Sequence, residues 1–191
     1  MKVYLSVLVQ MLFTISANCQ NIDYSNFDYK TFETKVVEKI NQYRKSVGLI
    51  QLNFSQTLKS YTSDKTSSDN SKNDLGKHLQ VSKINDTINL KLYQEIYKYS
   101  NGKCGSKEPS NIFVNEGFGE IISICEGKYA TYDELAIETL NGWLNSPGHK
   151  KIIETPFLDL NGYSGLISCS SKFSKSHKLY TTVNFVSVSS F

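Results

Sequence analysis

The sequence is poor in the residues that interrupt, cross-link or ligate: it has three Pro, four Cys, three His and one Trp among 191 residues. So few Pro, with eleven Gly, leave little room for a Pro- and Gly-rich linker. Four Cys are too few for the dense disulfide framework of many small secreted domains. Charge is nearly balanced, with 21 basic against 18 acidic side chains for a net +3, which argues against a nucleic-acid-binding surface. Beyond the N-terminus, no apolar run approaches the roughly 20 residues that a membrane-spanning helix needs.

What the sequence does contain is the composition of an ordinary globular domain. Hydrophobic residues make up 39% and charged residues 20% of the chain, and twelve Tyr and ten Phe supply material for a core. This balance excludes a disordered tail, a collagen-like chain and a coiled coil. A chain of this length forms one domain by default, so we expect a single folded unit.

The N-terminal segment predicts export. Lys2 precedes a largely apolar run at residues 3–15, and an Ala-Asn-Cys sequence then places small residues where a signal peptidase would cut. This is the layout of a secretory signal peptide, and the run is too short to span a membrane. We therefore expect residues 1–19 to be a signal peptide, residues 20–31 an extended lead-in, and residues 32–191 the domain of a secreted, extracellular protein.

Export gives meaning to two further features. Asn53 and Asn85 begin glycosylation sequons, which become usable on an exported chain. Cys104, Cys125 and Cys169 remain after cleavage, so at most one internal disulfide forms in the oxidising compartment. The pair Cys104–Cys125 is favoured because both flank the same irregular segment, and Cys125–Cys169 is the alternative. The third thiol is buried or links two chains, so we expect a monomer or a disulfide-linked dimer.

Apolar periodicity predicts that helices come first along the chain. Repeats at helical spacing indicate helices at residues 32–47, 55–67 and 90–97, the second fraying into the polar run that follows it. A further helix at residues 131–144 opens on a Thr-Tyr-Asp-Glu capping box and must end at the next Ser-Pro-Gly. A short helical piece is expected at residues 149–153.

The C-terminal part of the chain predicts strands. Residues 163–170 and 178–188 read as strands, the second with clear alternation, and residues 171–177 form the hairpin loop between them. Helices followed by strands predict an α+β domain in which helices pack on a small antiparallel sheet.

The most specific stretch begins at Trp143 and reads Trp-Leu-Asn-Ser-Pro-Gly-His. It resembles the W-x-N-S-P-G-H turn of the bacterial and protist branch of the CAP superfamily, which includes cysteine-rich secretory proteins, antigen 5 allergens and plant pathogenesis-related proteins. Gly119-Glu-Ile resembles the family's G-E-N, residues 41–52 resemble its first helix and loop, and residues 180–185 its last strand. The resemblance to this SCP-type domain covers residues 32–188.

The resemblance implies a three-layer α/β/α sandwich with a cleft that gathers His and acidic residues. Carried over by position, the cleft residues are His78, Glu120 and His149. Where animal and plant members carry a second Glu, this chain has Ser146, and Ile121 replaces the Asn of the family's G-E-N. The resemblance therefore predicts a triad in place of the family's full set of four.

Some family members bind a divalent metal in this cleft. Two imidazoles and a carboxylate suit Zn²⁺ with an open position for water, so His78 and His149 are the candidate ligands for zinc or another divalent cation. Glu116 and Glu138 are the nearest substitutes for the missing carboxylate. Sequence spacing does not show whether the two His meet, and a single His more often serves a local polar network.

Two classes of function follow. The resemblance favours a binding or signalling module that presents the cleft to an extracellular protein, lipid or sterol. The apolar face of residues 90–97 is expected to pack in the core, and an apolar groove for lipid or sterol is the alternative. The alternative is a metal-assisted hydrolase or peptidase that uses the same cleft to activate water. The sequence contains neither a Gly-x-Ser-x-Gly nucleophile turn nor a His-Glu-x-x-His helix. We therefore expect binding without turnover and assign no catalytic residue.

Overall fold

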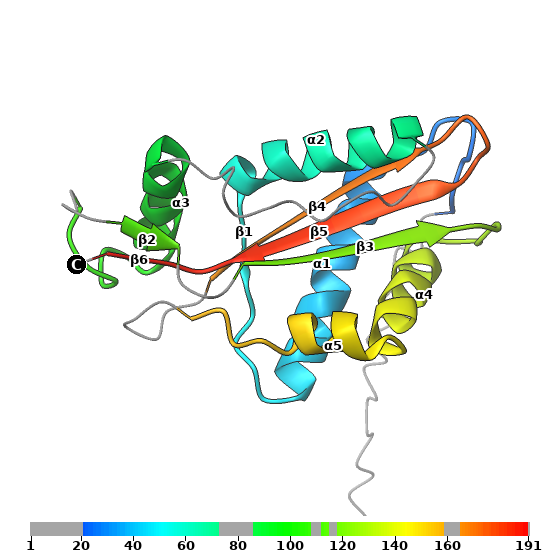
Figure 1. Ribbon diagram of the computed structural model, residues 1–191. Coiled ribbons are helices and arrows are strands. Elements are labelled where there is room, and N and C mark those ends of the chain that lie inside the picture. Colours follow the sequence, from blue (N-terminus) through cyan, green and yellow to red (C-terminus); the bar gives the residue numbers. More distant parts are fainter. Residues whose placement is uncertain (1–20, 73–85, 108–111, 115–117, 159–164, 191) are drawn as a thin grey trace, which may run out of the picture.

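The computed structural model describes residues 21–72, 86–107, 112–114, 118–158 and 165–190 (Figure 1). His78, Asn85, Glu116 and the predicted signal peptide lie outside these ranges. Among the described residues no helix is both long and apolar enough to cross a bilayer. In chain order the elements are α1 (Tyr29–Ser46), β1 (Asn53–Phe54), α2 (Gln56–Lys72), α3 (Asp86–Tyr99), β2 (Ile112–Val114), β3 (Gly119–Cys125), α4 (Tyr132–Leu144), α5 (Pro147–Ile153), β4 (Leu166–Phe173), β5 (Leu179–Val186) and β6 (Val188–Ser190).

The main sheet has four strands in the order β1-β4-β5-β3. The strands β4 and β3 both pair antiparallel with β5, while β1 pairs parallel with β4. The prediction of an antiparallel sheet is therefore wrong for β1. This strand is separated from β4 by most of the chain, so no hairpin connection forces the two to run in opposite directions. A second, two-stranded antiparallel sheet joins β2 and β6.

The elements form the predicted three layers. Helices α1, α4 and α5 lie on one side of the sheet and α2 lies on the other, while α3 and the β2–β6 pair lie at one end (Figure 1). The predicted α+β class, with helices on both faces of a small sheet, is confirmed.

The first helix begins earlier than the apolar pattern predicts. Asp28 caps it by accepting a hydrogen bond from the backbone N–H of Thr31 at 3.0 Å, so α1 starts at Tyr29 and the extended lead-in is shorter than expected. Phe32, Val36 and Ile40 are fully buried along α1 and face the sheet and α4.

The helix α2 is longer than apolar spacing predicts. The residues that hold its second half against the sheet are polar, so the apolar pattern does not detect them. Thr62, Thr66 and the ion pair Lys65–Asp69 are buried against the sheet, and Lys65 Nζ lies 2.6 Å from Asp69 Oδ1. Sequence periodicity finds only apolar stripes, so the expected fraying after residue 67 is wrong, and the helix continues to Lys72.

The predicted disulfide is absent, since Cys104, Cys125 and Cys169 are all thiols. Cys104 lies in the core cluster beneath α3, whereas Cys125 ends β3 and packs against the other cluster, which contains Cys169. The preferred pairing fails because residues 119–125 form a strand that carries Cys125 away from Cys104. Burial raises the pKa of the Cys125 and Cys169 thiols, which makes both poor nucleophiles.

Candidate functional site

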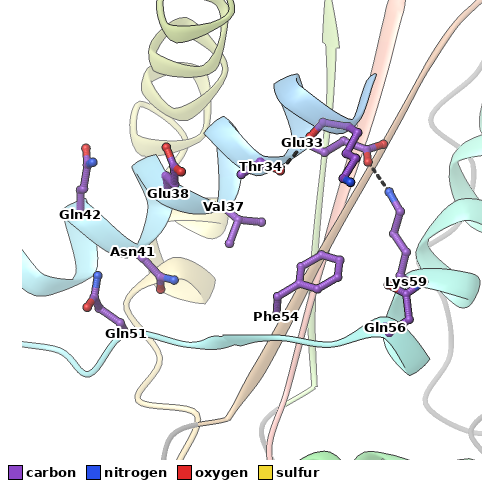
Figure 2. Close-up of a pocket in the computed structure, with 11 residues that line it drawn as sticks. Glu33, Thr34, Val37, Glu38, Asn41, Gln42, Gln51, Phe54, Gln56 and Lys59 are labelled. Atoms are coloured by element: carbon purple, nitrogen blue, oxygen red, sulfur yellow. Dashed lines mark hydrogen bonds and ion pairs between the residues drawn. The ribbon is translucent and has the colours of Figure 1, made fainter. Parts of the chain in front are cut away.

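A groove of about 680 Å³ runs along the exposed side of α1 (Figure 2). One wall is α1 and the other is the segment from Gln51 through β1 to the first turns of α2. We call it the α1 groove. It is lined by Lys30, Glu33, Thr34, Val37, Glu38, Asn41, Gln42, Gln51, Phe54, Gln56 and Lys59.

The middle of the α1 groove is apolar and faces solvent. Val37 of α1 and Phe54 of β1 face one another across it (Figure 2). Phe54 is 41% exposed, which is unusual for a Phe beside a sheet, and Val37 is half-buried. An exposed aromatic ring inside a concave site offers a surface for an apolar part of a ligand.

Two contacts fix the wall that carries Phe54. The side chain of Asn41 accepts from the backbone N–H of Leu52 at 2.8 Å and donates to the Leu52 carbonyl at 2.9 Å, as a strand partner would. The hydroxyl of Tyr99 on α3 donates to the Phe54 carbonyl at 2.7 Å. Because these groups are already bonded, this edge of the sheet is partly protected from pairing with another strand.

One end of the groove contains an internal ion pair. Glu33 of α1 pairs with Lys59 of α2 and also accepts from the backbone N–H of Ser171 at 2.7 Å. Lys59 Nζ also donates to the Cys169 carbonyl at 2.5 Å. The two charges are therefore bound to each other and to β4, and they tie α1 and α2 to the sheet at this point.

The pKa of Glu33 is raised, because burial disfavours its charged form more than Lys59 and the Ser171 N–H favour it, and Asp28 adds repulsion. The folded protein therefore binds this proton more tightly than the unfolded chain. We expect stability to fall as pH rises from the ordinary carboxyl pKa of 4.5 through the raised value, and the loss to be complete above it.

Replacing Glu33 with Gln should flatten this dependence. The free energy of unfolding in urea is measured from about pH 4 to about pH 7. As pH rises over this range, it should fall less, or rise more, in Glu33→Gln than in wild type. Glu38→Gln, an exposed change on the same helix, should keep the wild-type slope. Parallel curves for Glu33→Gln and wild type would contradict the assignment.

The structure places Glu120 on β3, where it is 4% exposed and lies opposite Asn184 of β5. A Cβ on the preceding Gly119 would meet Ile152 and Phe157, so Gly119 faces α5 and Glu120 faces the other side of the sheet. The carboxylate is thus on the face that α2 covers.

His149 is half-buried in α5, which contacts β3. It lies one helical turn before Ile152, the residue against Gly119, so the helix that carries it covers this end of β3 on the face opposite Glu120. His78 lies outside the described residues. Within the described part of the chain, no three His, Cys, Asp or Glu side chains are grouped so that they could hold a metal ion.

The remaining predicted positions are placed as follows. Glu138 is exposed on α4, and Ser146, at the position of the missing Glu, is the residue that precedes α5.

Asn53 is half-buried in β1, and the hydroxyl of its sequon partner Ser55 is buried and bonded to Glu95 of α3. Glycosylation of Asn53 would therefore have to precede folding. Along α3, the expected core packing is confirmed and the alternative apolar groove is absent, since its inward-facing residues are buried: Leu92, Tyr93 and Ile96.

Sequence reasoning did not find the α1 groove. It predicted a helix at residues 32–47 from apolar spacing alone, and that spacing does not separate Val37 from the buried positions of the helix. The one available signal was that Val37 lies beside, not within, the stripe formed by Phe32, Val36 and Ile40. The opposite wall comes from a two-residue strand that no periodicity can predict.

No protein-family model matches the chain, and no curated protein sequence matches it. Among solved structures, it is similar to an outer surface protein of Borrelia burgdorferi, with a TM-score of 0.53, 17% identity, and coverage of 84% of this chain and 96% of that one. It is also similar to an extracellular protein containing an SCP domain from Bacillus anthracis, with a TM-score of 0.45 and 18% identity. That match covers 83% of this chain but spans 41% of the Bacillus protein.

The likeness to the Borrelia protein shows a shared fold, and at 17% identity it shows no more than that. The Bacillus match has a TM-score below 0.5 and carries no inference. A shared fold does not fix the function, which depends on the residues of the site.

Proposed function

We propose that this chain is an extracellular, CAP-like binding module that takes an amphipathic ligand in the α1 groove. The observation that carries the proposal is the solvent-facing Val37–Phe54 centre between two polar ends. A concave site with an apolar middle and a few polar groups is the usual form of a small-ligand site. The groove is anchored by the Glu33–Lys59 pair and by the Asn41–Leu52 bonds, so it exists before a ligand arrives.

An extracellular location is supported by the signal-peptide pattern at residues 1–19 and by the fold shared with an outer surface protein. The partner is therefore expected to be a molecule found outside the cell or on its surface.

The proposal is tested with N-phenyl-1-naphthylamine, a neutral dye whose fluorescence rises in apolar sites. Wild type should enhance its fluorescence, and Phe54→Glu should lose most of the enhancement because it places a charge in the groove. Ile137→Glu on α4 is the matched control, since Ile137 is also 41% exposed and lies outside the groove. No enhancement by wild type, or equal enhancement by Phe54→Glu, would contradict the proposal.

The family resemblance supports a second site, in which His78, Glu120 and His149 hold Zn²⁺ or another divalent cation. The donor chemistry fits zinc, but Glu120 and α5 lie on opposite faces of β3, which argues against Glu120 as a ligand beside His149. Calorimetric titration with zinc chloride separates the outcomes. Uptake lost in His149→Ala and kept in the exposed-loop control His177→Ala would support the site, and no uptake by wild type would remove it. The alternative of a metal-assisted hydrolase uses the same residues and stays a prediction.

A further inference from the structure

We infer that the ligand of the α1 groove is a short, neutral glycan; this inference rests on the proposed function and names its ligand class. Three properties of the groove carry it: the sum of its charges, the mixed polar and apolar character of its walls, and the positions of two exposed amides.

The charges in the groove cancel. Lys30 and Lys59 contribute two positive charges, and Glu33 and Glu38 two negative ones. Three of the four are engaged: Glu33 pairs with Lys59, and Glu38 lies 3.1 Å from Lys35 on the same helix. The formal charges of the lining residues therefore sum to zero, so the groove does not select a strongly anionic or cationic ligand, and a neutral ligand fits it better.

The walls combine apolar side-chain stems with polar end groups, which suits a ligand that has both kinds of surface better than an acyl chain or a sterol. Of the eleven lining residues, only Val37 and Phe54 are apolar, and the other nine carry an amide, a hydroxyl or a charge. A long hydrocarbon would cover these polar groups without replacing their hydrogen bonds to water, which is costly. A sugar has hydroxyl groups around its rim and C–H groups on its ring faces, so it can bond the walls while one face packs on Phe54.

The amides that could bond such hydroxyls lie at the two ends of the groove. Gln42 of α1 is near one end and Gln56 at the start of α2 is near the other, with Phe54 between them (Figure 2). Both Gln side chains are exposed, and neither makes a hydrogen bond within the described part of the chain. Each amide offers two donors and an acceptor, which suits the mixed donor and acceptor character of a hydroxyl group.

The length of the groove indicates more than one sugar unit. Along α1 the lining extends from Lys30 to Gln42, and the stretch from Glu33 to Gln42 alone rises about 14 Å at 1.5 Å per residue. A single ring on Phe54 would not reach both Gln side chains, whereas a short linear chain would.

The test is calorimetric titration of the secreted protein with maltotriose, cellotriose and tri-N-acetylchitotriose. At least one of these should bind wild type, and its affinity should fall about tenfold or more in Phe54→Ala and in the double variant Gln42→Ala, Gln56→Ala, a change equivalent to about 1.4 kcal/mol. Ile137→Ala on α4 should bind as wild type does. All three substituted groove positions are exposed, so the variants should fold.

Binding of none of the three sugars, or binding that the groove variants leave unchanged, would overturn the inference. The dye experiment separates this failure from failure of the proposed function. If the dye still binds in a Phe54-dependent manner and palmitate or cholesterol displaces it, the groove is a binding site for a lipid and the glycan assignment is wrong. If the dye binding also fails, both proposals fall.

Discussion

Replacing Arg44 with Met is expected to lower the free energy of unfolding by about 3 kcal/mol or more, because hydrogen bonds from a charged donor contribute about 1.5–3 kcal/mol each and this side chain makes several. Arg44 is fully buried in α1, and its guanidinium also lies 5.9 Å from the ring centre of Phe157. It donates four hydrogen bonds of 2.6–3.0 Å, all to backbone carbonyls: those of Ile50, Ile153, Thr155 and Pro156.

These bonds hold the end of α1 to the loop before β1 and to the segment after α5. Burial lowers the pKa of Arg44 to about 10, so it remains a cation at physiological pH. Met fills similar space but leaves four carbonyls without their donor, and Lys should recover only part of the loss, because one ammonium cannot reproduce the spread of a guanidinium.

Urea unfolding followed by circular dichroism checks this prediction. Lys45→Met, an exposed change at the next position of α1, should alter stability by less than about 0.5 kcal/mol. Equal stability of Arg44→Met and Lys45→Met would show that the buried guanidinium does not hold these segments together.

Replacing Trp143 with Ala should be at least as damaging, with an expected loss of about 3–5 kcal/mol. Trp143 is 1% exposed in α4, fills the core between α4 and the sheet, and donates from Nε1 to the Ile122 carbonyl of β3 at 3.0 Å. The substitution removes the largest buried side chain and leaves a cavity next to the strand that carries Glu120.

Trp143→Phe is the matched control, because it keeps a ring in the core and loses the hydrogen bond, which should cost about 1 kcal/mol. Since Trp143 is the only Trp in the chain, unfolding has to be followed by circular dichroism in place of intrinsic Trp fluorescence. A loss in Trp143→Ala no larger than that in Trp143→Phe would contradict the role of the indole in the core.

Short sequence motifs predicted those helix ends and that hairpin which depend on residues close together in the chain. The capping box formed in α4, where Glu134 N–H donates to Thr131 Oγ1 at 3.2 Å and the Glu134 carboxylate accepts from the Thr131 N–H at 3.3 Å. Pro147 separated α4 from α5, which starts at the Pro itself, two residues earlier than expected, because Pro is well suited to the first turn of a helix. The strands β4 and β5 formed the predicted hairpin.

Features that depend on distant partners could not be predicted in the same way. The strand β3 was missed because Ile121 and Ile122 are both buried, so its sequence does not alternate, and its pairing with β5 joins segments that lie far apart in the chain. The polar end of α2 is held by buried groups such as the Lys65–Asp69 pair, for which apolar periodicity gives no signal.

The same contrast between features set by nearby residues and features set by distant contacts applies to the candidate site. Motif resemblance pointed to Glu120 and His149, and in the structure Glu120 and the helix that carries His149 lie on opposite faces of β3. The α1 groove depends on the approach of β1 to α1, which is set by the Asn41–Leu52 bonds and by Arg44. No residue pattern along the chain could have predicted that approach, because both contacts link a helix to a loop that has no periodicity of its own.

Mapping of backbone amide chemical shifts is the most direct test of the claim that the α1 groove is the ligand site. On addition of N-phenyl-1-naphthylamine to the ¹⁵N-labelled protein, the shifts should concentrate in residues 30–42 of α1 and residues 51–59 of the facing wall, with none around Ile137. Shifts that concentrate instead around Glu120 and His149, or that spread evenly over the surface, would contradict the account.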